Sequence, residues 1–339
     1  MPAELMVEVI RAGRVESEHL GHAAVVGRDG RLLFSLGDPA RRVYLRSSAK
    51  PFQSMAVVLS GAADRFSLTS ADLAIATASH TAEHVHQEQV LGLLSRVGQG
   101  VEDLQCGAHP PSDAGTAAEL ARQGIVPTAL HNNCSGKHAG MLGVAKALGA
   151  DIRDYLSPDA PGQRLVRRIV AAFCAVPEEE IGVGVDGCSA PVFEVPLQAL
   201  ALAYARLADP SGMPGEYAEA ARRVRDAMCE HPYLIAGRQR VGVDLMQVTD
   251  GRLVAKTGAE AVYGVGDRSR GQGLALKLLD GGSRGVAPAL VEALAQAGFL
   301  RPEETARLEK WHHPVQRNYA GREVGEVRPH FTLQVRASV

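Results

Sequence analysis

The chain has 339 residues, of which 46% are hydrophobic and 22% charged, and its formal net charge is −2. At roughly 150 residues per domain, this length allows one large domain or two ordinary ones, with ample apolar residues for a core. The balanced charge and the 4% aromatic content predict that the chain binds neither nucleic acid nor an anionic membrane.

The beginning of the chain has the alternating pattern of strands. Asp29-Gly30 is a dipeptide typical of a hairpin turn between two strands. A helix is expected to begin near Ser47, because Pro51 then falls in the first turn, where backbone amides have no helical partner. Residues 73–78 form either a short buried strand or the start of a helix. The strands expected in this part cover residues 7–11, 23–27 and 31–35.

The middle of the chain has the spacing of helices, and strand patterns return near the end. Helices are expected over residues 83–97, 114–123, about 137–149, 163–173, 196–208, 216–230 and 287–297. Strands are expected over residues 253–257, 261–265, 274–280 and 331–336.

This order of elements is not a regular strand–helix alternation. It predicts an α+β fold with an antiparallel sheet built from both termini and a helical middle region. No repeat or long linker interrupts the chain. We therefore expect a single domain over residues 1–339, with a helical lobe at about 50–240 and a sheet from 5–45 and 250–339.

The start of the chain and its cysteines predict its compartment. Glu4 and Glu8 give the first segment acidic residues, whereas a secretory signal begins with basic ones. No run reaches the roughly 18 apolar residues of a membrane span. The five cysteines are sparse and odd in number, which argues against a disulfide framework. We expect a cytoplasmic protein whose thiols pack, react or bind metal.

Ser47 and Lys50 are the first candidate catalytic pair. At a spacing of three residues they share one face of a helix. A serine hydroxyl becomes a good nucleophile only when a base takes its proton, and a neutral lysine can be that base. Alone, the pair has an ordinary alternative, which is a capping serine beside a surface lysine.

A second candidate is the run Lys256-Thr257-Gly258 on an expected strand. An early Ser-x-x-Lys and a late Lys-Thr-Gly strand form the scheme of serine β-lactamases and penicillin-binding proteins. Ser79 lies between them, where that scheme has a further serine, although the usual Ser-Asp-Asn is absent. The alternatives are a strand-edge lysine that prevents aggregation and a serine that caps a turn.

Thiols and basic groups are concentrated in two further loops. Cys134 and Lys137 lie in the run His131–His138, and Cys188 follows Asp186-Gly187. Two cysteines from two loops could hold a zinc ion together with another ligand. The alternative is two packed thiols, because cysteine is among the most buried residue types.

Five runs together make the chain resemble a known family, the thermolabile, rhizobial-type L-asparaginases. The runs are residues 46–51 (RSSAKP), 78–80 (ASH), 131–138 (HNNCSGKH), 184–191 (GVDGCSAP) and 255–260 (AKTGAE). The resemblance extends from about residue 7 to the end. It implies a serine β-lactamase-like fold, usually in a homodimer, that hydrolyses L-asparagine to L-aspartate and ammonia.

The resemblance also assigns roles to residues of this sequence. It implies two Ser–Lys pairs, a zinc site and a substrate-binding group. The pairs are Ser47 with Lys50 and Ser79 with Lys256, the zinc ligands are Cys134, Lys137 and Cys188, and the substrate-binding residues are Arg46, His138 and Asp186. Three of the six lysines in the chain therefore fall on functional positions.

The expected mechanism is acyl transfer. Ser47, deprotonated by Lys50, attacks the side-chain amide of asparagine, and the other Ser–Lys pair relays a proton to the leaving ammonia. Because both pairs have the same parts, the choice of nucleophile stays open. Zinc is expected to help orient the amino acid. The alternatives are a β-lactamase or peptidase, and a zinc-dependent amino-acid-binding protein without turnover.

Overall fold

The computed structural model of the chain describes residues 1–336, and its strands form two antiparallel sheets. The larger sheet has the order β10-β11-β1-β2-β9-β8-β7, with β3 also paired to β2 and β12 to β3. The smaller sheet has the order β4-β6-β5. The strands are β1 (Glu4–Arg11), β2 (Arg14–Gly27), β3 (Leu32–Leu36), β4 (Arg42–Tyr44), β5 (Gly182–Val185), β6 (Pro191–Pro196), β7 (Leu253–Gly258), β8 (Val262–Asp267), β9 (Gln272–Leu278), β10 (Val315–Arg317), β11 (Glu323–Pro329) and β12 (Gln334–Val335).

The larger sheet joins the two ends of the chain. β1 pairs with β2 on one side and with β11 on the other, and β2 pairs with β9. The predicted turn at Asp29-Gly30 joins β2 to β3, where Gly30 has a φ of +88° and donates its N–H to Gly27 O at 2.9 Å. The predicted α+β class and the sheet built from both termini are confirmed.

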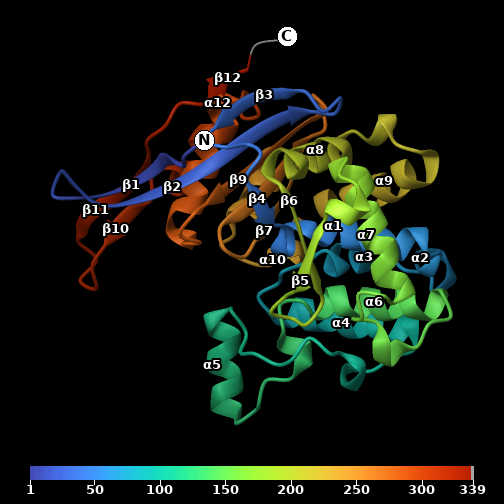
Figure 1. The fold of residues 1–339 in the computed structure, drawn as a ribbon. Coiled ribbons are helices and arrows are strands. Elements are labelled where there is room, and N and C mark those ends of the chain that lie inside the picture. The colour runs from blue at the N-terminus through green and yellow to red at the C-terminus, as the bar shows by residue number, and fades with distance from the viewer. Residues whose placement is uncertain (337–339) are drawn as a thin grey trace.

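The helices come mainly from the middle of the chain (Figure 1). Their bounds are α1 (Lys50–Leu59), α2 (Ala62–Arg65), α3 (Ser70–Ala76), α4 (His84–Val97), α5 (Ala114–Gln123), α6 (Ser135–Ala147), α7 (Pro161–Cys174), α8 (Leu197–Ala208), α9 (Gly215–Glu230), α10 (Pro232–Ala236), α11 (Val241–Val248), α12 (Val286–Gln296), α13 (Pro302–Arg307) and α14 (Glu309–His312).

Helix α8 packs directly on strands β2, β8 and β9. Glycines make this close approach possible. A Cβ atom at Gly273 would lie 1.9 Å from Ala201 O, and one at Gly264 would lie 2.1 Å from the Tyr204 ring. Only glycine leaves the space for a helix backbone at such positions. The side chain of Tyr204 thereby extends from α8 to the residues just before α1.

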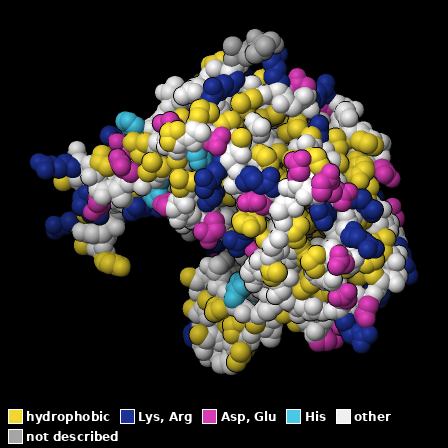
Figure 2. Space-filling view, viewed as in Figure 1, with side chains coloured by type: hydrophobic (Ala, Val, Ile, Leu, Met, Phe, Trp, Pro, Cys, Tyr) yellow, Lys and Arg dark blue, Asp and Glu magenta, His cyan; other side chains and the backbone are white. Residues whose placement is uncertain are grey.

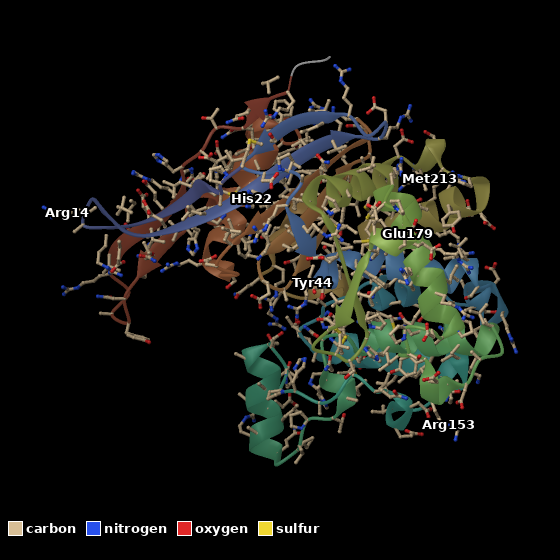
Figure 3. The ribbon with its side chains drawn as sticks, in the orientation of Figure 1. Arg14, His22, Tyr44, Arg153, Glu179 and Met213 are labelled. Carbon is tan, nitrogen blue, oxygen red and sulfur yellow. The ribbon has the colours of Figure 1, made fainter. Side chains whose placement is uncertain are left out.

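The smaller sheet was not expected, because β5 and β6 come from the middle of the chain. β4 ends at Tyr44, which Figure 3 labels where the chain leaves the sheets for the helices. A short 3-10 helix, η1 (Arg46–Ala49), follows and leads into α1. β4 of the smaller sheet therefore ends shortly before Ser47, the first candidate serine.

The structure settles one local alternative, at residues 73–78, and corrects one expected strand, at residues 331–336. Residues 73–78 fall mostly in helix α3, because Thr69 and Asp72 form a capping box that starts a helix. The expected strand over residues 331–336 is wrong in extent, since β12 covers only Gln334–Val335. The side chain of Gln296 takes the backbone bonds of Phe331 and Leu333 instead, and β11 is the C-terminal strand that pairs with β1.

Helix α5 and the loops beside it stand apart from the other helices (Figure 1). The space-filling view shows a hollow between this segment and the projecting end of the larger sheet (Figure 2). Within residues 1–336, none of the helices combines the length and the hydrophobicity that crossing a membrane requires.

Candidate active site

Ser47 lies on η1, which neighbouring elements hold from two sides. Tyr204 Oη donates a hydrogen bond to Ser48 O at 2.8 Å. On the other side, Gly258 of β7 is so close that a Cβ atom there would lie 2.7 Å from Leu45 O. Arg46 has a φ of +48°, which is costly for a residue other than glycine. The tertiary structure therefore imposes the position of Ser47.

Ser79 follows α3 and is fixed through its neighbours. Its N–H donates to Ile235 O at 2.9 Å, and the N–H of His80 donates to Asn133 O at 3.2 Å. The His80 ring lies 2.9 Å from the hydroxyl of Ser135. These bonds join the segment after α3 to α10, to the loop that precedes α6 and to the first residue of α6.

Two lysine amines meet at the hydroxyl of Ser79. Lys50 Nζ lies 2.9 Å from Ser79 Oγ, and Lys256 Nζ lies 2.8 Å from the same atom. Lys50 also donates to Ala78 O and Lys256 to its neighbour Thr257 O. The structure brings together three of the four predicted catalytic residues. Within residues 1–336, Ser47 Oγ forms no hydrogen bond, so the expected Ser47–Lys50 contact is not made.

Burial favours the neutral form of these two amines. Lys50 and Lys256 are each 1% exposed. Burial lowers the pKa of Lys256 well below its ordinary value, and the nearby Lys50 charge lowers this pKa further. Burial likewise lowers the pKa of Lys50. A neutral amine beside a hydroxyl is the arrangement that general-base catalysis needs.

Cys134, Lys137 and Cys188 also lie together. Lys137 Nζ donates to Cys188 Sγ at 2.9 Å, and Cys134 lies close enough to both groups for each of them to shift its pKa. Cys134 directly precedes α6, whereas Cys188 lies in the β5–β6 turn, where Ser189 has a φ of +69°. All three side chains are at least 95% buried.

The thiol cluster has the chemistry of a metal site. The hydrogen bond from Cys188 lowers the pKa of Cys134 well below its ordinary value, and the amines of Lys50 and Lys137 lower it further. Two sulfurs, from the residue before α6 and from the β5–β6 turn, and one nitrogen from α6 match the ligand types that zinc prefers. The residues present therefore fit the expected zinc ion.

Two of the three predicted substrate-binding residues are close to this cluster in the chain, since Asp186 lies two residues before Cys188 and His138 directly follows Lys137. Arg46 Nε donates to Asp186 Oδ1 at 2.8 Å. His138 is fully buried, its Nδ1 lies 2.7 Å from Tyr155 Oη, and its Nε2 is buried without a partner within residues 1–336. Arg46 and Asp186 are therefore brought together, whereas His138 lies on α6 and forms no hydrogen bond with either of them within residues 1–336.

A cavity of about 420 Å³ lies at Ser47, Ser79 and Lys256. Its lining also includes Arg240 and Glu260, which the sequence analysis missed. Glu260 has a φ of +61°, and Gln239, directly before Arg240, has a φ of +55°. Backbone strain of this kind collects at functional sites. Glu260 lies in the run 255–260, which the sequence analysis recognised, whereas no local pattern identified Arg240 as a site residue.

No curated protein matches the chain. Among solved structures, Mglu in its native form is 17% identical with a TM-score of 0.44, covering 83% of this chain and 61% of the Mglu chain. A β-lactamase from Mycobacterium bovis is 16% identical with a TM-score of 0.42, and the match covers 83% of this chain and 95% of that β-lactamase. A putative β-lactamase from Bacteroides dorei is 12% identical with a TM-score of 0.41, and the match covers 81% of this chain and 93% of that protein. The chain thus spans about three fifths of Mglu's length.

The comparison with protein families is decisive for the class of protein. It places the chain among the amidohydrolases. More particularly, the chain belongs to the L-asparaginase II family, whose model matches residues 7–329. The family predicted from the five sequence runs is confirmed.

Proposed function

We propose that the chain hydrolyses L-asparagine to L-aspartate and ammonia through a serine acyl-enzyme. The observation that carries the proposal is the pair of buried lysine amines at 2.9 Å and 2.8 Å from Ser79 Oγ, on the wall of a cavity. Family membership supports the amide as substrate class.

In this proposal Ser79 is the nucleophile. A neutral lysine takes the hydroxyl proton, and Ser79 Oγ forms an ester with the side-chain carbonyl carbon of asparagine. The C–N bond breaks, and ammonia leaves with the proton that the lysine has taken. Water then cleaves the ester, with the same lysine as base. Lys256 suits the role of base, because burial and the neighbouring Lys50 lower its pKa.

Ser47, which the sequence analysis expected to make the attack, is the competing nucleophile. It lines the same cavity at the start of a helix, where free backbone N–H groups can stabilise an oxyanion. Its hydroxyl lacks a lysine partner within residues 1–336, and this absence is why we assign the attack to Ser79. Under this assignment Ser47 contacts the carbonyl oxygen of the substrate.

The amino acid's charged groups are proposed to meet Arg46 and Asp186, and His138, which is fully buried, is proposed to support this part of the binding site from α6. Arg46 uses only its Nε for Asp186, which leaves its two terminal nitrogens for a carboxylate. Asp186 can accept from the α-ammonium group.

Cys134, Lys137 and Cys188 would hold zinc, which would supply a fixed positive charge next to the bound amino acid. This part of the proposal is supported by the converging sulfur and nitrogen ligands.

The test is ammonia release from L-asparagine and, in parallel, L-glutamine. We expect the wild type to be active on asparagine and Ser79→Ala to lose at least about a hundredfold in kcat. Mass spectrometry of the quenched enzyme should find the aspartyl adduct on Ser79. An adduct on Ser47 would contradict our assignment of the nucleophile. Turnover of a β-lactam without ammonia release, or asparagine binding without turnover, would reject the asparaginase itself.

The resemblance to the asparaginase family further implies a homodimer in the cytoplasm, and we propose both. Light scattering of the purified protein at several concentrations measures the first, and fractionation of the producing cells measures the second. A mass equal to that of one chain at all concentrations would reject the homodimer.

A further inference from the structure

A second group of metal-ligating side chains lies outside the thiol cluster. Glu309, His312 and His313 come from α14 and the residue after it, and one ligand atom from each lies within 4.8 Å of the others. Their spacing of three and four residues puts them on one side of a helical turn. Within residues 1–336, no other group of three or more His, Cys, Asp or Glu side chains comes together in this way.

A carboxylate of helix α12 orients His312, the buried histidine of the group. His312 Nε2 lies 2.7 Å from Glu292 Oε2 of helix α12, and Gln296 donates to the other oxygen of that carboxylate at 2.6 Å. A histidine that gives one ring N–H to a carboxylate presents its second nitrogen as a lone pair. Metal-binding histidines characteristically have such a carboxylate partner.

The other two ligands are accessible and uncommitted. Glu309 is exposed and His313 half-buried, and neither side chain forms a hydrogen bond or ion pair within residues 1–336. Ligand atoms around a tetrahedral zinc ion lie about 3.3 Å apart, given bonds of about 2.0–2.2 Å. Rotation of the exposed Glu309 side chain can supply the remaining approach.

We propose that Glu309, His312 and His313 bind a divalent transition metal ion such as Zn²⁺, Ni²⁺ or Cu²⁺. Two imidazoles and one carboxylate are ligands that suit these ions and not Ca²⁺ or Mg²⁺, which favour oxygen. Because Glu309 faces solvent, the site keeps open coordination positions for water. The proposal does not depend on the function proposed above.

The site adjoins the wall of the active-site cavity. Trp311, between the ligands in sequence, lines that cavity, and its Nε1 donates to Asp244 of α11 at 2.8 Å. His312 is already held to α12 by Glu292, and a bound ion would hold Glu309 and His313 to His312 and so fix the segment that carries Trp311. Trp311 is also the only tryptophan of the chain, which provides a local optical probe.

The experiment is a titration of the metal-free, full-length protein with Ni²⁺, followed by tryptophan fluorescence. We expect saturable quenching in the wild type and at least about tenfold weaker binding in His313→Gln and in Glu309→Gln. Both variants change side chains that are not fully buried, so the fold is expected to persist, and circular dichroism checks it. His84→Gln is the matched control, because His84 is an exposed histidine beside Glu119 at 3.0 Å.

A further variant separates this site from the thiol cluster. Cys188→Ala should leave the Ni²⁺ quenching of Trp311 unchanged. Equal quenching in the wild type and in His313→Gln, or quenching that vanishes only in Cys188→Ala, would overturn the proposal. An absence of saturable quenching in the wild type would overturn it as well.

Discussion

Burying a lysine amine costs free energy unless the amine is neutral or paired, and this chain buries three of its six lysines at one site. Lys50 and Lys256 meet at a serine hydroxyl, and Lys137 meets two thiols. Arginine is abundant elsewhere in the chain, but a guanidinium cannot give up its proton near neutral pH. Lys50 and Lys256 therefore use the one property of lysine that arginine lacks. Burial lowers the pKa of Lys137 too, but the Cys134 and Cys188 sulfurs outweigh burial and raise it, so Lys137 would use this property only when it binds a metal ion.

Lys137→Arg tests this property at the proposed zinc site. A lysine that binds zinc must be neutral, which costs about 4–5 kcal/mol at pH 7 from its ordinary pKa, and the ion offsets this cost. We expect Lys137→Arg to retain at least about tenfold less zinc after dialysis. KM for asparagine should rise more than kcat falls. Metal analysis by emission spectrometry and steady-state kinetics measure both quantities.

The matched control is Lys146→Arg on the same helix, α6. Lys146 lies at the end of α6 opposite Cys134 and donates to the backbone oxygen of Val97 at 2.7 Å, a bond that arginine can also make. This variant should keep its zinc and its KM. Full zinc retention by Lys137→Arg would mean that Lys137 is not a ligand.

At the scale of elements, the contact between β7 and η1 sets the geometry of the site. β7 carries Lys256, and η1 carries Ser47. Their backbones come together at Gly258, where a Cβ atom would lie 2.7 Å from Leu45 O and 3.3 Å from Ser48 N. Both neighbours are backbone atoms, which cannot move aside cheaply. The glycine of the Lys-Thr-Gly run is thus a packing requirement of the site.

Gly258→Ala should therefore separate β7 from η1. We expect a loss of about 1–3 kcal/mol in the free energy of unfolding and a fall in kcat. Denaturant titration and ammonia release measure the two effects. Gly92→Ala on α4 is the control, because a Cβ atom there meets nothing within 4 Å. It should raise the free energy of unfolding by about 0.5–1 kcal/mol and leave kcat unchanged. Unaltered kcat in Gly258→Ala would show that this contact does not position the site.

At the scale of the whole molecule, Glu83 ties the start of α4 to the loop after α10. Burial raises its pKa, but hydrogen bonds from Tyr233, Thr81 and Arg238 outweigh burial and lower the pKa to about 2. The same loop continues to Arg240 in the cavity wall. Glu83 therefore connects segments about 150 residues apart in sequence.

The lowered pKa of Glu83 predicts how stability depends on pH. Its ordinary pKa is 4.5, so the unfolded chain takes up the proton first as pH falls. The stabilisation is complete above pH 4.5, and it is lost as pH falls from 4.5 toward 2. Glu83→Gln should lower the free energy of unfolding by about 2–3 kcal/mol at pH 7 and flatten its dependence on pH below 4.5.

Urea unfolding at a series of pH values measures this prediction. Glu88→Gln, an exposed carboxylate on the same helix, is the control and should follow the wild type. An equal pH dependence in Glu83→Gln and the wild type would contradict the assignment of this acid sensitivity to Glu83.

The sequence determined the features that are encoded over a few residues. Helix α5 has the predicted bounds, 114–123, because Asp113 caps its first turn and Gly124 ends it with a φ of +65°. The Asp29-Gly30 hairpin and the five family runs were likewise legible from local pattern. These signals depend on turn and capping chemistry, which acts between near neighbours in the chain.

The contacts between side chains that are distant in sequence depend on the tertiary structure. Ser79 is 29 residues from Lys50 and 177 residues from Lys256, so the packing of α1, α3 and β7 sets their contact. For the same reason the sequence paired Lys50 with Ser47, missed Arg240 and did not foresee the small β4-β6-β5 sheet. A local pattern indicates the chemistry of which each residue is capable, whereas the packing of the whole core determines which residues become its neighbours.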